Sequence, residues 1–407
     1  MTGIARLTGT VKHYDWGGMD FIPFLLQIKN DAKKPFAEYW LGVHPLADCR
    51  IETGNGEQKL LRDSIRENKE ASLGSYVNKK FGDLPYLLKI MDVKDMLSIQ
   101  VHPSKADAEK GFAEENAAGI PLTSPKRNYK DANHKPELIA ALNDFWLLHG
   151  FKPADQLSKV LDTIPELNEL KTAFGNNNYE GLYRKVMMMP QPEVNRLLQP
   201  LLDRIIPLYQ TNKLHKTQED FWAARAALTF SKGSAIDRGI FSVYFFNILL
   251  LKKGEAIFQD AGIPHAYLEG TGVEIMSNSD NVLRGGLTPK HVDVNELLKH
   301  VKCEATLFSI LKPGNDHEKE TIYTTPAPDF ELSCIQLDKG ITYTITSSTA
   351  EIFILTKGKA SLSATANLIE LYPGNPAAIV FAGVQAQLTG IENTTVFRAT
   401  VPIHSGE

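Results

Sequence analysis

Short apolar runs separated by polar turns dominate the first 150 residues, and they fit β-strands better than helices. The run that precedes Pro103 ends on two polar side chains, Gln100 and His102. Alternate residues of a strand point to the same face, so this run would place both side chains together. We expect strands over residues 36–42, 86–91 and 96–101 and a helix over residues 105–115.

From residue 151 to about residue 230 the apolar positions change to the spacing of a helix. One such set runs from Leu157 to Ile164, and a longer set runs from Val194 to Ile205. We therefore interpret this region as a helical insertion. Proline has no backbone N–H to donate, so we expect the helices to break or kink at Pro165, Pro190, Pro200 and Pro207.

Strand-like runs return after Phe230. Asp293 and Glu296 have the spacing of a capping box, which predicts a short helix that begins there. In the tail from about residue 310, turn residues interrupt the apolar runs at short intervals, which is typical of an antiparallel sandwich or barrel. The predicted strands cover residues 240–251, 256–259, 332–337, 341–345, 351–356, 378–381 and 396–401.

Composition narrows the class of protein. A chain of 407 residues is too long for one ordinary core, and 43% hydrophobic with 23% charged residues is usual for a soluble globular protein. The net charge of -4 argues against a nucleic-acid partner. The longest apolar stretch is too short to span a membrane, and the N-terminus lacks a signal peptide's apolar core. Three scattered cysteines suggest no disulfide framework, so we expect a cytoplasmic protein.

Four side chains of metal-ligand type lie far apart in the sequence. They are Gln100, His102, Glu137 and His265. Two imidazoles, one carboxylate and one amide oxygen would suit a divalent ion of borderline or hard character with a position left open for substrate. Taken singly, each has a plainer reading: a polar strand residue, a loop histidine or a surface carboxylate. The metal site is thus a hypothesis that depends on convergence of the four.

Two further segments add to this hypothesis. The spacing Gly254-x5-Asp260-x-Gly262-x2-His265 resembles the second metal motif of cupin barrels, although Glu269 stands where asparagine is commoner. Residues 274–290 carry two cations, Arg284 and Lys290, around a Gly-Gly turn whose amides would approach an anion. A solvated loop with ordinary surface charges is the alternative for this second segment.

Together these motifs resemble the type I mannose-6-phosphate isomerases (phosphomannose isomerases). The resemblance covers about residues 14–293, with small departures at Val101 and Gly285. It is carried by Tyr14-Asp15-Trp16-Gly17-Gly18, Ala37-Glu38-Tyr39-Trp40-Leu41-Gly42-Val43-His44-Pro45, Leu97-Ser98-Ile99-Gln100-Val101-His102-Pro103, Asn133-His134-Lys135-Pro136-Glu137 and residues 278–290.

The resemblance implies a site, a cofactor and a fold. One zinc ion per chain would be bound by Gln100, His102, Glu137 and His265. The catalytic arginine would be Arg284, and the sugar-phosphate pocket would be lined by Ser98, Lys135, Tyr267, Glu274, Asp280 and Lys290. The implied fold is mainly β, with two cupin-type β-barrel or jelly-roll domains and an α-helical domain. The catalytic cupin would comprise residues 1–150 and 231–309, the helical domain residues 151–230, and a metal-free cupin-like domain residues 310–407.

The implied reaction interconverts mannose 6-phosphate and fructose 6-phosphate through a cis-enediol. Zinc would act as a Lewis acid on the sugar oxygens, and Arg284 would stabilise the developing oxyanion. Lys135 is our candidate for the base that moves the proton between C2 and C1. The competitors are His134, Asp280 and Glu274, and His134 with Asp280 could instead open the sugar ring. Lys290 and Ser98 would hold the phosphate.

Two other classes fit part of the pattern. His102, Glu137 and His265 also satisfy the two-histidine, one-carboxylate count of a non-haem iron oxygenase, although Gln100 and the adjacent cations disfavour it. A sugar-phosphate-binding protein with an inactive site is the second alternative. The sequence leaves the oligomeric state open, with a monomer favoured, and we expect a small-molecule sugar phosphate as ligand, with no nucleic acid and no membrane.

Overall fold

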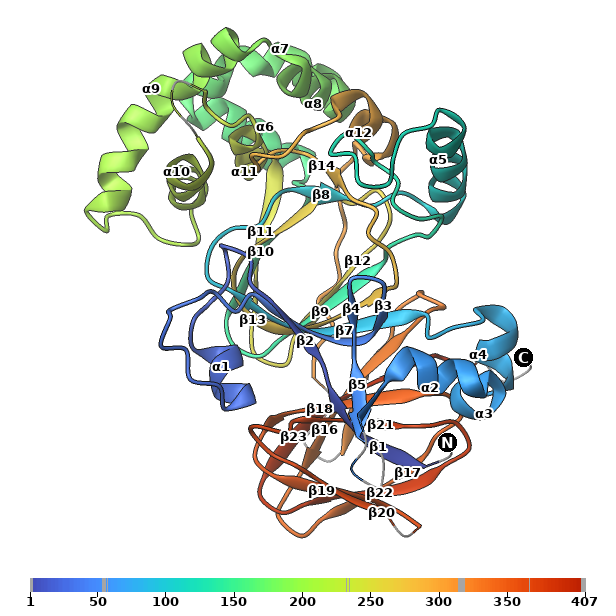
Figure 1. Cartoon of the computed structure of the whole chain (residues 1–407). Helices are drawn as coiled ribbons and strands as arrows, with labels where there is room; N and C mark the ends of the chain where they lie inside the picture. Colours follow the sequence, from blue (N-terminus) through green and yellow to red (C-terminus); the bar gives the residue numbers. More distant parts are fainter. Residues whose placement is uncertain are drawn as a thin grey trace.

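The chain combines helices with three antiparallel β-sheets in the computed structural model, which describes residues 3–52, 56, 58–231, 233, 235–313, 319–365 and 367–403. Figure 1 shows the central strands between a group of helices at one end and the C-terminal strands at the other. Strand pairing among these residues does not close any sheet on itself. No helix in the described ranges is long and apolar enough to cross a membrane.

An 11-stranded central sheet carries the residues of interest. Its longest member, β13, pairs with β10 and β8 near its start and with β7 and β9 along the rest of its length. The strands are β2 (Thr10–Lys12), β3 (Glu38–His44), β4 (Ala47–Asp48), β7 (Tyr86–Val93), β8 (Gln100–Val101), β9 (Glu137–Ala141), β10 (Phe145–Phe151), β11 (Phe246–Leu251), β12 (Ala256–Gln259), β13 (His265–Ser277) and β14 (Leu283–Arg284).

The expected helices between residues 151 and 230 are present, and two of the four prolines stand at helix boundaries, as predicted. Pro165 begins η1 and Pro190 precedes α9, whereas α9 continues through Pro200 and Pro207. One face of α9, from Val194 to Ile205, is buried, and this packing outweighs the lost backbone hydrogen bonds. The helices are α6 (Ala154–Thr163), η1 (Pro165–Leu170), α7 (Lys171–Phe174), η2 (Gly175–Asn177), α8 (Tyr179–Met188), α9 (Gln191–Gln210) and α10 (Glu219–Phe230).

Two strand predictions were wrong in part. The apolar run 240–251 begins as a helix, α11 (Gly239–Phe245), and only then becomes β11. Every residue of α11 is buried, and a run that is apolar on all sides has no periodicity to distinguish helix from strand. The predicted strand 96–101 is reduced to the two residues of β8, because the amides of Leu97 and Ile99 donate to Tyr267 and Gly286 outside any regular ladder.

The C-terminal strands form an eight-stranded and a four-stranded antiparallel sheet, as the turn spacing predicted. Three N-terminal strands complete the larger sheet, in the order β15-β16-β23-β18-β21-β1-β5-β6, and the smaller order is β17-β22-β19-β20. The strands are β1 (Ile4–Thr8), β5 (Arg50–Glu52), β6 (Gln58–Leu60), β15 (Glu320–Tyr323), β16 (Glu331–Leu337), β17 (Thr342–Thr346), β18 (Glu351–Lys357), β19 (Ala360–Ala364), β20 (Asn367–Leu371), β21 (Ala377–Val380), β22 (Gln385–Gly390) and β23 (Thr394–Thr400).

Short helices complete the structure. The predicted cap at Asp293 is confirmed, because its Oδ1 accepts the amide N–H of Glu296 at 3.0 Å at the start of α12. The predicted helix 105–115 is confirmed as α5, capped by Ser104. The remaining helices are α1 (Phe21–Leu26), α2 (Leu61–Glu67), α3 (Lys69–Leu73), α4 (Ser75–Lys80), α5 (Lys105–Ala117) and α12 (Val294–His300).

Candidate metal centre and its cavity

Three of the predicted ligands meet in the interior of the central sheet. Nε2 of His265 lies 3.2 Å from Oε2 of Glu137, and Nε2 of His102 lies 3.4 Å from the same oxygen. One ligand atom from each of the three residues lies within 4.8 Å of the other two, and all three side chains are buried. Residues from three separate strand regions of the sequence are therefore brought to one point.

Hydrogen bonds to the backbone orient both imidazoles so that Nε2 of each ring is turned toward Glu137. Nδ1 of His102 donates to the carbonyl of Asn281 at 2.8 Å, and Nδ1 of His265 donates to the carbonyl of Ile263 at 3.0 Å. Each ring therefore carries its proton on Nδ1 and presents a lone pair on Nε2. Burial lowers the pKa of His102 to about 4, so the ring is neutral at pH 7. Its buried Nε2 has no hydrogen-bond partner within the described chain.

This donor set fits a tetrahedral divalent ion. Nitrogen and oxygen donors about 2.1 Å from such an ion lie about 3.4 Å from each other, close to the two separations between Glu137 and the histidines. Gln100 lies in β8 directly opposite His265 of β13 and Arg284 of β14, and it lines the same cavity. The structure therefore places Gln100 next to the three converging donors, and its role as fourth ligand stays a prediction.

A cavity of about 60 Å³ adjoins these donors and is unusually rich in buried charge. Nζ of Lys135 lies 2.8 Å from Oε1 of Glu137, and Nζ of Lys89 lies 2.7 Å from Oε2 of Glu274. The hydroxyl of Tyr267 donates to Oε1 of Glu274 at 2.8 Å. Lys135, Tyr267 and Glu274, which were predicted to line the pocket, are thus placed there together.

Sequence reasoning missed two members of this cavity, Glu38 and Lys89. Both are buried, Glu38 accepts a hydrogen bond from the indole of Trp40, and both line the cavity. Burial acts to lower the pKa of Lys89, but the carboxylates of Glu274, Glu38 and Glu137 outweigh it and raise the pKa above its usual value. A lone lysine inside the apolar run of β7 was the signal that could have identified it.

His134 and Asp280 do not meet each other. Nε2 of His134 pairs with Oδ2 of Asp329 at 2.7 Å, and Oδ2 of Asp280 lies 3.4 Å from Nε2 of His44. Partial burial acts to raise the pKa of Asp280, but the hydrogen bond and charge of His44 outweigh it, so the net shift is downward. Neither side chain lines the cavity beside Glu137. The prediction that His134 and Asp280 together open the sugar ring is therefore not supported by a direct contact between these two side chains.

The two cations, Arg284 and Lys290, are suited to bind an anion, whereas most backbone amides of the turn between them are already hydrogen-bonded. Arg284 is half-buried and has no carboxylate within ion-pair distance in the described ranges. Burial lowers its pKa, and burial together with the charge of Arg284 lowers the pKa of Lys290. Three amides at this turn already have partners: the amide of Gly285 donates to the carbonyl of Ile99, and the amides of Leu287 and Thr288 donate to the carboxylate of Asp237.

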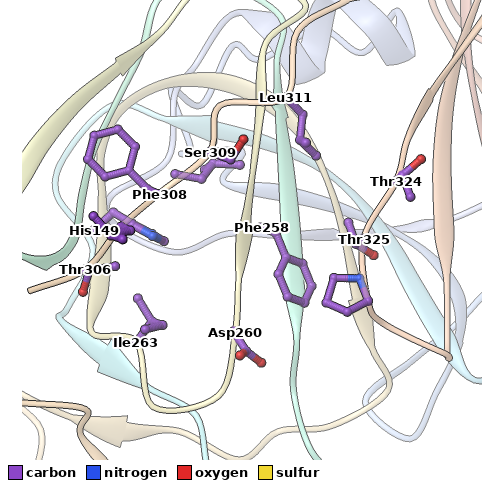
Figure 2. Close-up of a pocket in the computed structure, with 13 residues that line it drawn as sticks. His149, Phe258, Asp260, Ile263, Thr306, Phe308, Ser309, Leu311, Thr324 and Thr325 are labelled. Atoms are coloured by element: carbon purple, nitrogen blue, oxygen red, sulfur yellow. The ribbon is translucent and has the colours of Figure 1, made fainter. Parts of the chain in front are cut away.

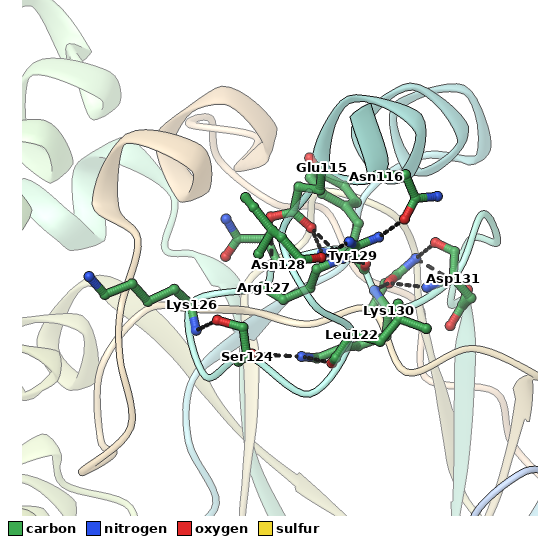
Figure 3. Close-up of polar contacts among 12 residues, drawn as sticks. Glu115, Asn116, Leu122, Ser124, Lys126, Arg127, Asn128, Tyr129, Lys130 and Asp131 are labelled. Atoms are coloured by element: carbon green, nitrogen blue, oxygen red, sulfur yellow. Dashed lines mark hydrogen bonds and ion pairs between the residues drawn. The ribbon is translucent and has the colours of Figure 1, made fainter. Parts of the chain in front are cut away.

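A polar network behind the site fixes the carbonyl that orients His102. Asp131 accepts hydrogen bonds from the hydroxyl of Ser279 at 2.8 Å and from the amide N–H of Asp280 at 2.8 Å, and the side chain of Asn281 donates to its backbone. The preceding loop is held in turn by Arg127, as Figure 3 shows. The imidazole is thus oriented by a rigid loop instead of a mobile one.

Known proteins resemble this chain along nearly its whole length. Residues 4–154 match the family model described as phosphomannose isomerase type I, catalytic domain. The mannose-6-phosphate isomerase of Salmonella typhimurium is 37% identical over 383 residues, which cover 92% of this chain and 94% of that protein. The mannose-6-phosphate isomerase of Homo sapiens is 33% identical over 436 residues, covering 97% of each chain. A Salmonella typhimurium crystal structure bound to substrate and to zinc has a TM-score of 0.87 at 33% identity, covering 98% of this chain and 100% of that one.

Replacement of His265 by alanine should remove the bound metal without unfolding the protein. The change deletes one of three close donors. Mutation of a residue that only hydrogen-bonds to a metal ligand typically reduces metal affinity by about 10–100-fold, so loss of a ligand itself should reduce it further. Elemental analysis after dialysis gives the metal content, and far-UV circular dichroism reports the fold. His13→Ala, at an exposed histidine, is the matched control and should keep its metal. Full metal occupancy in His265→Ala would remove this residue from the ligand set.

Proposed function

Because the chain belongs to the type I phosphomannose isomerases, we propose that it interconverts mannose 6-phosphate and fructose 6-phosphate with one zinc ion bound at the centre described above. The observation that carries the proposal is the convergence of His102, Glu137 and His265 beside a charged cavity. Similar proteins named for this activity cover almost the whole chain, and one of them binds zinc and its substrate.

In the proposed enzyme, Gln100, His102, Glu137 and His265 hold the zinc ion. Bound there, zinc supplies Lewis-acid chemistry toward the sugar's oxygens. A single carboxylate among the four donors leaves the centre with a net positive charge, which suits it to a developing enediolate. Lys89 and Lys135 are both buried, so their charges act in the cavity with less screening than at the surface.

Lys135 is the proposed base of the proton transfer between C2 and C1. Its ammonium nitrogen lines the cavity and lies beside the ligand Glu137, whereas His134 and Asp280 are paired elsewhere. Glu274 lines the cavity too, but both of its oxygens are held, one by Lys89 and one by Tyr267. Of the four candidates we therefore prefer Lys135, which lines the cavity beside a proposed zinc ligand and would act as the base in its neutral amine form.

The positively charged side chains are the proposed groups that bind the phosphate and stabilise the developing oxyanion. Arg284 has no carboxylate partner in the described ranges and lies opposite Gln100, so its guanidinium is available to a substrate oxygen. Lys290 and Ser98 are the proposed phosphate contacts, with Ser98 half-buried two residues before Gln100. This assignment gives the positive groups one role each and leaves Glu274 and Tyr267 to contact sugar hydroxyls.

The domain organisation follows the same proposal. Residues 1–150 with 231–309 would be the catalytic cupin-type domain, residues 151–230 the helical domain, and residues 310–407 a cupin-like domain without metal. The group of helices in Figure 1 supports the helical domain. The C-terminal strands support the last domain, but β1, β5 and β6 from the first 60 residues complete its larger sheet and would belong to it as well. We propose a cytoplasmic monomer, in keeping with cysteines that are all free.

Removal of metal should abolish the activity reversibly. A coupled assay that follows fructose 6-phosphate formed from mannose 6-phosphate should show turnover that chelation removes and added zinc restores, because the Lewis acid is lost and then replaced. Oxygen uptake measured in parallel should stay at background. Undiminished turnover in a chelator-treated, metal-free protein would contradict the proposed function.

Replacement of Arg284 by alanine should lower kcat by about 10²–10³-fold while zinc and the fold survive, as for loss of one oxyanion donor. Steady-state kinetics with mannose 6-phosphate and elemental analysis measure the two effects. Arg196→Ala, at an exposed arginine of α9, is the matched control and should turn over like the parent chain. Equal turnover of Arg284→Ala and the control would defeat the catalytic assignment.

Replacement of Lys135 by methionine should slow turnover by about 10²–10⁴-fold, the usual contribution of a general base. The more specific readout is proton exchange: in D₂O the parent chain should place deuterium on the sugar carbons, and Lys135→Met should not. Lys105→Met changes an exposed lysine and should exchange normally. The zinc content of Lys135→Met must be measured as well, because Lys135 pairs with the proposed ligand Glu137. Undiminished exchange in zinc-loaded Lys135→Met would transfer the role to another group.

A further inference from the structure

A second and larger cavity, of about 320 Å³, lies beside β10 and β12 under the segment 306–311. Figure 2 shows His149, Thr306 and Phe308 on one side of it, with Phe258 and Thr325 on the other. Its volume falls within the range of about 300–1,000 Å³ typical of small-molecule sites. Among the described residues, it shares no lining side chain with the cavity at the metal centre.

A β-bulge builds one wall of this second cavity. The register between β10 and β11 shifts between His149 and Phe151, and Gly150 at the shift has a φ of +57°. A Cβ added to Gly150 would lie 2.1 Å from Oγ1 of Thr306, so only glycine fits. The amide of Thr306 donates to the carbonyl of Phe151 at 3.0 Å. The wall is therefore fixed by packing and by hydrogen bonds.

Two buried polar groups on this wall are available to a ligand. Oγ1 of Thr306 is buried and has no hydrogen-bond partner in the described chain, which is unusual for a buried hydroxyl. Nδ1 of His149 donates to Oε1 of Gln259 at 2.7 Å, which leaves Nε2 as an acceptor. A hydroxyl can satisfy both groups.

The remaining surface selects against negative charge. Aromatic rings supply flat apolar faces, with the ring of Phe308 edge-on to His149 at a centroid distance of 6.1 Å and Phe258 across the cavity. Asp260 and several threonine and serine hydroxyls supply further hydrogen-bonding groups, and no lysine or arginine of the described ranges lines the cavity. The carboxylate of Asp260 pairs with Nζ of Lys302 at 3.4 Å, outside the lining, so the cavity offers a phosphate no free cation, whereas the carboxylate oxygens still accept hydrogen bonds from hydroxyls.

We propose that this cavity is a second binding site, which takes an unphosphorylated sugar or polyol. Such a ligand combines hydroxyls for His149, Thr306 and Asp260 with C–H faces for the aromatic rings. The site is close to the metal centre in the sheet, because His149 of β10 lies directly opposite His265 of β13. It would allow the chain to bind neutral and phosphorylated carbohydrate at the same time.

Calorimetric titration of the zinc-loaded full chain with D-mannose tests the proposal. Ser309 is exposed on the covering segment and lines the cavity, so Ser309→Trp should fill the cavity and abolish the binding heat, and Ser309→Ala should leave it. Thr306→Val removes a hydroxyl that has no partner in the described chain, so the fold should persist while affinity falls tenfold or more, about 1.4 kcal/mol. Binding should also persist in saturating mannose 6-phosphate.

Three results would each overturn the proposal. They are the absence of saturable heat with D-mannose, equal affinity in Ser309→Trp and Ser309→Ala, and complete loss of binding when mannose 6-phosphate is added, which would locate the sugar at the metal centre. The Ser309 pair decides the matter even for a chain with no isomerase activity. Failure of this proposal is therefore separable from failure of the proposed function.

Discussion

Strand β13 imposes the constraint on which the metal centre depends, because a single extended segment has to contact four other strands. Its 13 residues begin at His265, opposite Gln100, and reach Met276, opposite Glu137. Cross-strand neighbours on one face are close enough for their side chains to share a ligand. A slip of one residue between β8 and β13 would turn Gln100 away from His265, so this register also determines the chemistry.

The charged interior next to this strand is stable only as a set. Two ammonium groups, Lys89 and Lys135, face the carboxyl groups of Glu38, Glu137 and Glu274 with little access to water. Loss of one partner in such a group typically costs about 3–5 kcal/mol, because it leaves an uncompensated buried charge. A bound divalent cation adds positive charge to a cavity in which carboxyl groups outnumber ammonium groups. With a metal bound, the same set of charges therefore stabilises the folded protein, and its members at the open side of the cavity are available to a substrate.

Local pattern was a good guide wherever one face of an element meets solvent. The C-terminal strands were predicted from apolar runs between turn residues, and the helices α6 and α9 from helical spacing. The pattern failed in α11, which is buried on all sides, and in the irregular approach to Gln100, whose backbone bonds go to distant segments. Of the site, His102, Glu137 and His265 were named from motifs and converge in the structure, whereas Lys89 was overlooked within an apolar strand. The roles of Gln100 and Arg284 stay predictions.

From the amino-acid sequence alone it was possible to name the donor residues, the family resemblance and most regular elements, since motifs and periodicity are local properties of the chain. Which groups pair with which was decided by the tertiary structure. His134 meets Asp329, which lies 195 residues away, and Asp280 meets His44 instead of His134. The second cavity likewise depends on a bulge at Gly150 and on a segment that begins at Thr306. Such contacts arise from long-range packing, and no local pattern encodes the distance between two side chains that only the folded sheet brings together.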